Sequence, residues 1–339
     1  MITRTGRYTL LLDQHPMAAG FAAVAGKKEG EGPLARQFDK IFEDTKLGQE
    51  TWEKAESAMQ EQAVHLALDK ASISPQQVDY VLAGDLINQC TSSIFGLRSL
   101  DIPFVGLFGA CSTMALSLGL AGLLVESGAA STCAAVTSSH FCTAERQFRF
   151  PLEYGGQRPP TSQWTATASG CAIITPSTNG GGPQIAGVTF GRMVDMGIKD
   201  ANNMGAAMAG AAAATIVDFL KDTGKKPEDF DVILTGDLGQ VGSDLMQQLL
   251  SRENIELGTH YADCGLLIYD RQTQDVHAGG SGCGCSAAVV CSYIMNLLKT
   301  GGMKNVLFVG TGALMSPMTV QQGESIPGIA HAVWLKSAY

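Results

Sequence analysis

Short apolar runs, typical of buried strands, alternate along the chain with longer stretches whose apolar residues recur at helical spacing. A helix is predicted from about Thr51, because threonine is a favourable N-cap residue and apolar positions recur through Leu68. Residues 78–83 form an apolar run that ends in Gly and Asp, as expected of a strand leaving a buried sheet. The segment up to about Gly32 lacks either pattern, so we expect it to be irregular.

The same order of segments occurs twice. Residues 68–86 read LDKASISPQQVDYVLAGDL, and residues 220–238 read LKDTGKKPEDFDVILTGDL, in register and without a gap. Both copies continue with a Gly- and Cys-containing helix start, a helix of small residues and an apolar strand. Such self-similarity indicates a structural unit that is built twice.

The duplication predicts two similar α/β halves. We expect an N-terminal half at residues 1–178, a Gly-rich junction at residues 179–182 and a C-terminal half at residues 183–339. The alanine-rich segment from Met204 to about Thr215 should open a helix of the second half that packs closely against another helix.

Composition limits the classes of function. The 339 residues are 45% hydrophobic and 16% charged, which suits a globular chain with a large core. A net charge of −9 without basic runs argues against a nucleic-acid surface. The chain has no uninterrupted apolar stretch of about 18 residues, and its N-terminal apolar stretch is short for a signal peptide, so we expect neither membrane span nor secretion.

Nine cysteines without a CxxC pair predict reduced thiols, most of them buried, and no structural metal. Cys111 is the cysteine with the clearest chemical context. It follows the apolar run 104–108 and precedes a predicted helix at residues 112–127, where a helix N-terminus would lower the pKa of its thiol. Nucleophilic use would need a base, normally histidine, and the alternative is a buried cysteine selected for its size.

A polar, arginine-bearing segment begins at His140, and an elaborate loop of this kind between strands is often functional. Arg146 and Arg149 are three residues apart, as on one face of a helical turn. If they face Cys111, the natural ligand is an anion. Alternatively, the segment is a rigid contact between subunits or domains, and the arginines pair with neighbouring glutamates.

Asp85 and Asp237 occupy equivalent strand ends in the two copies. Such positions border the ligand clefts of α/β sheets, yet an aspartate there also caps the next helix. The sequence favours capping. The glycine-rich loop at residues 279–286 lacks the P-loop lysine, and we expect it to let one backbone pass close to another.

Long motifs, in order from about His15 to His331, resemble the stage V sporulation protein AD family, within the thiolase and ketoacyl-synthase superfamily. The motifs are WEKAE at 52–56, AGDLINQ at 83–89, FGACST at 108–113, AERQFR at 144–149, EYGGQ at 153–157, ILTGDL at 233–238, GLLIY at 265–269 and SIP at 325–327.

The resemblance implies a thiolase-like, five-layer αβαβα fold built from two pseudo-symmetric halves. It also implies a sporulation protein that binds dipicolinic acid (pyridine-2,6-dicarboxylate) and supports its uptake into the developing spore. The expected partners are membrane proteins of the same operon, and the expected location is peripheral, at the cytoplasmic side or surface of the spore inner membrane. By analogy with the superfamily we expect a homodimer.

The resemblance also implies loss of catalysis. Where condensing enzymes of the superfamily carry a histidine, this chain has Asp237, and an aspartate does not replace imidazole as a base at neutral pH. We expect no cofactor, although calcium could accompany the ligand. Two alternatives stay open. The first is a structural plug or scaffold of the spore membrane channel that uses the segment up to Gly32 and the loop around Tyr154 as contact surfaces. The second is an acyltransferase with Cys111 as acyl acceptor and His140 or His331 as base.

Only Cys111 is carried over from the superfamily motif as a ligand-site residue. The other candidates follow from their positions: His140, Arg146, Arg149 and Thr311 as contacts, and Asp85, Asn88 and Asp237 as groups that shape the cleft or meet calcium.

Overall fold

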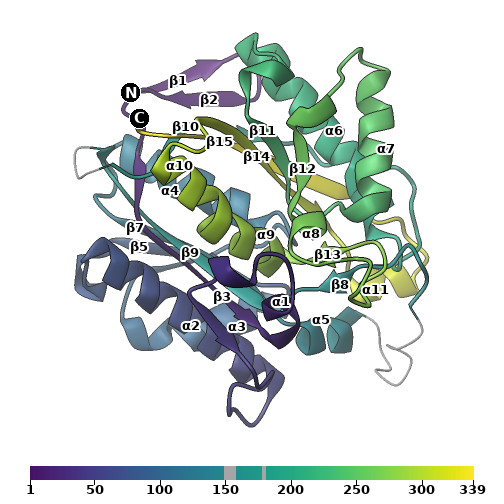
Figure 1. Cartoon of the computed structure of the whole chain (residues 1–339), viewed down its shortest axis with the longest axis horizontal. Helices are drawn as coiled ribbons and strands as arrows, with labels where there is room; N and C mark the ends of the chain where they lie inside the picture. The colour runs from purple at the N-terminus through teal and green to yellow at the C-terminus, as the bar shows by residue number, and fades with distance from the viewer. Residues whose placement is uncertain (149–157, 178–180) are drawn as a thin grey trace.

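The computed structural model describes residues 1–148, 158–177 and 181–339 (Figure 1). Its main strands fall into two sets. The first set comprises β3 (Met17–Gly26), β5 (Tyr80–Gly84), β6 (Phe104–Gly106), β7 (Cys133–Ser139) and β9 (Ala168–Thr175). The second comprises β10 (Gln184–Phe190), β11 (Val232–Thr235), β12 (Tyr261–Asp263), β14 (Asn305–Ala313) and β15 (Gly328–Lys336).

The two sets have the same topology. The strand order is β6-β5-β7-β9-β3 in the first and β12-β11-β14-β15-β10 in the second. In each set the first three strands pair in parallel, and the last two add in antiparallel orientation. The sets meet where Met17 pairs with Gln184. The predicted duplication is therefore confirmed at the level of the fold.

Helices separate and cover the two sheets. On the outer faces lie α2 (Trp52–Ala71) with α3 (Thr91–Leu97), and α6 (Met204–Thr223) with α7 (Gly239–Ser251). Between the sheets lie α4 (Thr113–Glu126) and α9 (Cys283–Val289), which contact each other (Figure 1). Because α4 is apolar on nearly all sides, it suits burial between two sheets. The result is the expected five-layer αβαβα arrangement.

The predicted helices are present. Thr51 caps α2 by accepting a hydrogen bond from the Lys54 N–H at 3.2 Å. Helix α9 continues through a π-helical segment (Val290–Ile294) into α10 (Met295–Thr300). By length and composition α6 and the 283–300 helix could cross a membrane, but 78% and 72% of their apolar windows are buried inside the fold.

The remaining elements are short. They are α1 (Lys27–Gly30), β4 (Lys40–Phe42), α5 (Phe141–Phe148), β8 (Trp164–Thr165), α8 (Cys264–Leu267), β13 (Gly280–Ser281), α11 (Pro317–Gln321) and single turns of 3₁₀ helix at Ala35–Gln37, Pro75–Gln77, Asn88–Cys90, Arg98–Leu100, Pro227–Asp229 and Gly258–His260.

The expectation that the chain is irregular up to Gly32 is wrong. This segment forms β1 (Ile2–Thr5), β2 (Thr9–Leu12) and the long, buried strand β3. β3 reads MAAGFAAVAG, which shows neither period-two alternation nor many β-branched residues. Its small residues let α2 approach closely, since a Cβ on Gly20 would lie 2.3 Å from the Ala67 carbonyl oxygen.

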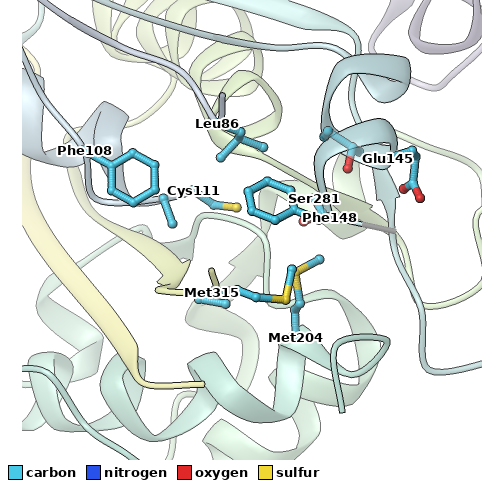
Figure 2. A pocket seen from close by; sticks show the side chains of 12 residues that line it. Leu86, Phe108, Cys111, Glu145, Phe148, Met204, Ser281 and Met315 are labelled. Carbon is cyan, nitrogen blue, oxygen red and sulfur yellow. The ribbon is translucent and has the colours of Figure 1, made fainter. Parts of the chain in front are cut away.

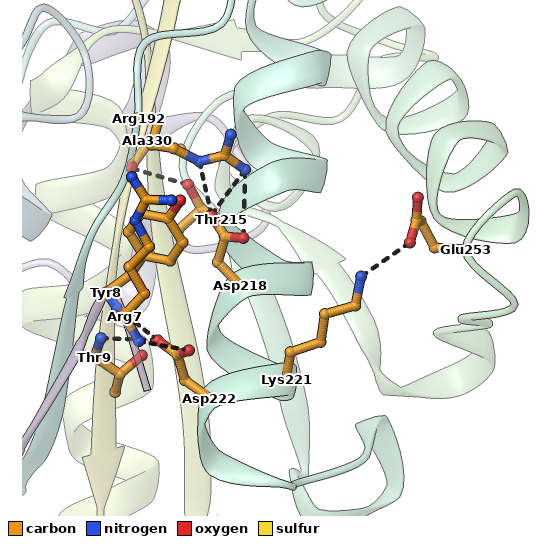
Figure 3. A network of polar contacts seen from close by, with 10 residues as sticks. All are labelled: Arg7, Tyr8, Thr9, Arg192, Thr215, Asp218, Lys221, Asp222, Glu253 and Ala330. Atoms are coloured by element: carbon orange, nitrogen blue, oxygen red, sulfur yellow. Dashed lines mark hydrogen bonds and ion pairs between the residues drawn. The ribbon is translucent and has the colours of Figure 1, made fainter. Parts of the chain in front are cut away.

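The β1–β2 hairpin attaches to the second half although it precedes the first half in sequence. Strand β2 pairs with β10. The Asp222 carboxylate on α6 accepts hydrogen bonds from the backbone N–H groups of Arg7, Tyr8 and Thr9 at 3.0, 2.8 and 2.9 Å (Figure 3). The domain limits 1–178, 179–182 and 183–339 remain predictions, and residues 178–180 lie outside the described residues.

Candidate functional site

A cavity beside Cys111 collects side chains from both halves (Figure 2). Its volume is about 30 Å³, room for one or two water molecules. The lining is mostly apolar, and its larger side chains are Leu86, Phe108, Phe148, Met204 and Met315. The polar side chains that line it are Cys111, Glu145, Thr165 and Ser281.

A tight turn between β6 and α4 positions Cys111. Ala110 adopts a positive φ of 48°, which is strained for a residue with a side chain. Two side-chain bonds hold the turn: the Ser112 hydroxyl donates to the Gly109 carbonyl, and the Thr113 hydroxyl donates to the Ala110 carbonyl, both at 2.6 Å. The thiol of Cys111 therefore projects from a fixed backbone into the cavity.

Strand β14 of the second half passes directly under this turn. A Cβ on Gly312 would lie 2.5 Å from the Gly109 carbonyl oxygen, and one on Gly310 would lie 2.6 Å from the Ala115 Cβ. Glycine at both positions lets the two halves approach closely enough for β14 to bring Thr311 beneath the cysteine loop.

Asp237 is fully buried and faces Cys111. Its Oδ1 accepts a hydrogen bond from the Thr311 hydroxyl at 2.7 Å. Its Oδ2 accepts from the Gly282 N–H at 2.8 Å and the Ser281 hydroxyl at 3.1 Å, and the Cys111 thiol lies close enough to this carboxylate for the two groups to interact electrostatically. Three of the predicted site residues, Cys111, Asp237 and Thr311, thus form one cluster.

The thiol is the opposite of an activated nucleophile. Burial, followed by the adjacent Asp237 carboxylate, raises the pKa of Cys111 well above its usual value. The expectation of a lowered thiol pKa is therefore wrong. The helix start of α4 supplies only a partial positive charge, and removal from water beside a carboxylate outweighs it.

The histidines do not supply a base at this cavity. Nε2 of the buried His140 lies 2.7 Å from the Thr45 carbonyl, and its Nδ1 accepts the Cys142 N–H at 3.1 Å. Nδ1 of His331 accepts the Gly191 N–H at 3.2 Å, and burial lowers the pKa of its ring to about 4. Among the described residues that line the cavity there is no histidine, lysine or arginine.

Arg146 does not face the cavity either. It forms an ion pair with Glu53, and its guanidinium lies 5.5 Å from the centre of the Trp52 ring, on the outer side of α5. The expectation that it faces Cys111 is wrong, because Arg146 does not line the cavity. The alternative, that the arginines pair with Glu145 and Glu153, stays a prediction, since residue 153 lies outside the described residues. Arg149 lies outside the described residues, directly after Phe148, which does line the cavity.

The two equivalent aspartates have different roles. Asp85 organises its own loop, as the capping interpretation expects, because its Oδ2 accepts the N–H and hydroxyl of Ser93 in the first turn of α3. Asp237 does not cap α7; that role belongs to Asp263, which accepts the Leu238 and Gly239 N–H groups at 2.8 and 3.0 Å.

Neither Asp85 nor Asn88 lines the cavity. Asn88 donates its backbone N–H to the Gln147 side chain at 2.9 Å, so it connects a loop to α5. The role of each predicted residue as a ligand contact stays a prediction.

Sequence reasoning missed most of the lining. Methionines and phenylalanines such as Met204 and Phe148 look like ordinary core residues, and only their positions in the fold bring them to Cys111. Ser281 lies in the glycine-rich loop, whose expected role in close backbone packing is confirmed: a Cβ on Gly284 would lie 2.3 Å from the Ala168 carbonyl oxygen. The glycine-rich loop was the sequence feature that could have pointed to Ser281 as a lining residue.

All nine cysteines are free; eight are buried and Cys142 is half-buried, as expected. Within the described part of the chain, no three His, Cys, Asp or Glu side chains are grouped as metal ligands would be. Calcium that accompanies a ligand is not tested by this observation.

Comparison with known proteins identifies the family. The sequence profile of Stage V sporulation protein AD (SpoVAD) matches residues 6–336. The Stage V sporulation protein AD of Bacillus subtilis (strain 168) is 46% identical over 335 residues, which are 98% of each chain.

Solved structures of other proteins share the fold. The 3-oxoacyl-(acyl-carrier-protein) synthase III of Aquifex aeolicus has a TM-score of 0.58 at 14% identity, covering 95% of this chain and 99% of that one. An E-to-Q variant of Xanthomonas campestris OleA has a TM-score of 0.59 at 13% identity, covering 96% and 99%. These identities establish the fold alone. The chain belongs to the stage V sporulation protein AD family and has a thiolase-like fold.

Proposed function

We propose that this sporulation protein is a non-catalytic binder whose cavity beside Cys111 receives dipicolinate and so supports uptake of dipicolinate into the developing spore. The observation that carries the non-catalytic part is the contact between Asp237 and Cys111. A thiol in acyl transfer needs a base and a stabilised thiolate. Here a buried carboxylate occupies the neighbouring position and favours the protonated thiol.

Dipicolinate is proposed as the ligand from the family resemblance, and the lining of the cavity favours one charge state of dipicolinate over another. Phe108, Phe148 and Met315 offer apolar faces to a planar ring, while Thr165 and Ser281 offer hydroxyl groups. The nearby Asp237 carboxylate would repel a free dianion, and the described lining has no histidine, lysine or arginine side chain. A calcium chelate, in which the two ligand charges are neutralised, suits such a cavity better.

A titration calorimetry experiment tests the proposal. Dipicolinate, with and without calcium, is added to the parent protein, to Cys111→Ala and to Ala144→Trp, which fills the cavity from α5. We expect saturable binding that is tighter with calcium and weakened at least about tenfold by the tryptophan. Cys142→Ala, on the same helix but outside the lining, serves as the control and should bind like the parent.

Absence of heat at millimolar ligand in both conditions would favour the scaffold alternative, in which partner contacts replace the pocket. The contact surface of that alternative must then be reconsidered, because β3 (Met17–Gly26), which lies in the segment up to Gly32, is almost wholly buried, and the loop around Tyr154 lies outside the described residues. Binding that Ala144→Trp leaves unchanged would place the ligand elsewhere on the protein.

The apolar lining supports a second candidate, an acyltransferase that uses Cys111 as acyl acceptor. This alternative predicts that an acyl-CoA adds its acyl mass to the parent protein and not to Cys111→Ala. Because the thiol has a raised pKa and the described lining offers no histidine, we expect no such adduct at neutral pH.

The expected homodimer and membrane partners complete the proposal. β6 is an edge strand, and an apolar group beside it is exposed: Phe95 is 56%, Phe104 is 40% and Phe108 is 50% exposed. An uncovered edge with aromatic side chains favours pairing with another chain. We propose that a second copy covers it, and that the dimer lies peripherally at the spore inner membrane beside membrane proteins of the same operon.

A further inference from the structure

Two carboxyl groups, Glu56 on α2 and Asp85 at the end of β5, are completely buried behind one wall of the cavity. Neither lines the cavity. The two groups interact electrostatically, since Asp85 contributes to the raised pKa of Glu56. A buried pair of acids destabilises a fold unless hydrogen bonds compensate for the loss of water. The hydrogen bonds of this pair therefore show what holds it in place.

Each acid binds a segment that carries part of the wall. Oε2 of Glu56 accepts the Thr143 hydroxyl at 2.6 Å, which fixes the first turn of α5 to α2. Oδ1 and Oδ2 of Asp85 accept the N–H groups of Ile87 and Ser93, both at 2.8 Å, which fixes the loop between β5 and α3.

A chain of hydrogen bonds joins the two acids. Oε1 of Glu56 accepts the Ser138 hydroxyl at 3.0 Å. Nε2 of Gln60 lies 3.2 Å from the Ser138 hydroxyl and 3.1 Å from the Ser93 hydroxyl, which itself donates to Asp85 at 2.7 Å. Movement at either acid therefore reaches the other.

The two held segments are parts of one wall. Leu86 from the loop, and Ala144, Glu145 and Phe148 from α5, line the cavity. Gln147 fastens them together, because its Nε2 donates to the Leu86 carbonyl at 3.0 Å and its Oε1 accepts the Asn88 N–H at 2.9 Å. Since the cavity has a volume of only about 30 Å³, a ligand larger than water enters only if a wall such as this one moves.

The charges around the pair do not neutralise it. The titratable or charged groups on the elements packed against it are Glu53, Lys54, Glu61, His65, Asp69 and Lys70 on α2, all exposed or half-buried; Tyr80 and Cys90 on or after β5; Cys133 on β7; His140, Cys142, Glu145 and Arg146 on or next to α5; and Cys283 and Cys285 on α9. Arg146 is engaged outward with Glu53, and burial lowers the pKa of His140, which keeps it neutral.

Burial and the neighbouring Asp85 raise the pKa of Glu56 to about 8, and burial also raises the pKa of Asp85. At neutral pH the pair therefore retains a proton. Among the described residues the Ser92 hydroxyl, buried beside Glu56, has no other partner and is placed to share that proton's hydrogen bond.

We propose that Glu56 and Asp85 form a proton-controlled latch on the wall of the Cys111 cavity. With a proton on the pair, α5 and the 85–93 loop stay fastened to α2 and the cavity stays closed. Loss of the proton leaves two negative charges, and the repulsion between Glu56 and Asp85 pushes the 85–93 loop away from α2, so that Leu86 moves and the cavity opens. This inference concerns access to Cys111 and does not depend on which ligand binds.

Alkylation of Cys111 by iodoacetamide, followed by peptide mass spectrometry, measures that access without dipicolinate. The parent and Glu56→Gln are compared at about pH 7 and about pH 9.5, on either side of the titration. At each pH the alkylation rate of the parent is divided by that of Glu56→Gln, which removes the effect of thiol ionisation that the two proteins share. We expect a ratio near one at the lower pH and roughly tenfold faster labelling of the parent at the higher pH, because only the parent gains the repulsive charge.

Asp69→Asn removes an acid from the exposed face of the same helix and should follow the parent at both pH values. A Glu56→Gln ratio that does not change with pH overturns the proposal, as does slower labelling of the parent at high pH, which the charge alone would cause by raising the thiol pKa.

Hydrogen exchange of the parent keeps the proposal testable if Glu56→Gln does not fold. Protection factors of peptides covering residues 85–93 and 141–148 should fall above about pH 8, while those of residues 204–223 stay constant. An equal fall in all three peptides, or no fall, overturns the latch.

Discussion

The Asp237 carboxylate lies beside the Cys111 thiol and interacts with it electrostatically, while Thr311 and Gly282 donate hydrogen bonds to its two oxygens. The contact joins the nucleophile position of one half to the strand end of the other. It adds to the effect of burial in raising the pKa of the thiol, because a carboxylate beside sulfur disfavours the thiolate.

Asp237→Asn should therefore make Cys111 more reactive. Removing the charge lowers the thiol pKa, and each unit of pKa corresponds to about a tenfold change in the thiolate fraction at neutral pH. We expect alkylation of Cys111 by iodoacetamide at pH 7 to become about tenfold faster or more, as measured by peptide mass spectrometry. Asp244→Asn, on the exposed face of α7, should leave the rate unchanged; equal rates in the parent and Asp237→Asn would show that burial alone raises the pKa.

Glu56 should make stability depend on pH. Its pKa is about 8 in the folded protein and about 4.5 when unfolded, so the folded state binds the extra proton between these values. Stability should fall as pH rises from about 4.5 to about 8, by up to about 1.4 kcal/mol per pH unit from this group. Urea unfolding of Glu56→Gln at several pH values should show a shallower fall than the parent or Asp69→Asn, which removes an exposed acid of the same helix. Parallel curves for all three would mean that Glu56 is ionised in the folded protein.

Gly20 should be intolerant of even one added methyl group. A Cβ there would lie 2.3 Å from the Ala67 carbonyl and 2.5 Å from the Ala71 nitrogen, so α2 would have to move off β3. We expect Gly20→Ala to lower the free energy of unfolding by about 2–3 kcal/mol. In the control, Gly323→Ala, the added Cβ meets open space. Only the positive φ of 78° should lower the free energy of unfolding, by about 1 kcal/mol. A smaller loss at Gly20 than at Gly323 would mean that the helix shifts easily.

Phe104→Asp should disrupt the proposed homodimer. A charge on the β6 edge would have to be buried against the second copy without a partner. Sedimentation velocity should give a dimer for the parent and a monomer for the variant. Met193→Asp, which places the same charge on a residue of the second half that is 71% exposed, should remain dimeric. A parent that sediments as a monomer would contradict the proposal directly.

The sequence was sufficient for the duplicated unit, for the helices from Thr51 and Met204 and for the cysteine-bearing helix start. Each rests on local periodicity, capping or repetition, which are properties of neighbouring residues. It failed at β3, because a fully buried strand of alanine and glycine carries no periodic signal. The close approach of α2 is the reason for those residues, and that contact joins segments about 50 residues apart.

The sequence by itself determined the family, the fold class and the placement of Cys111 at the start of a buried helix. Only the tertiary structure decided which side chains meet that cysteine. Asp237 and Thr311 reach it from the second half, while His140 and Arg146, much closer in the chain, point to other partners. The pKa of the thiol followed from the same packing: burial and a neighbouring carboxylate depend on distances in space, and these outweighed the local effect of a helix N-terminus.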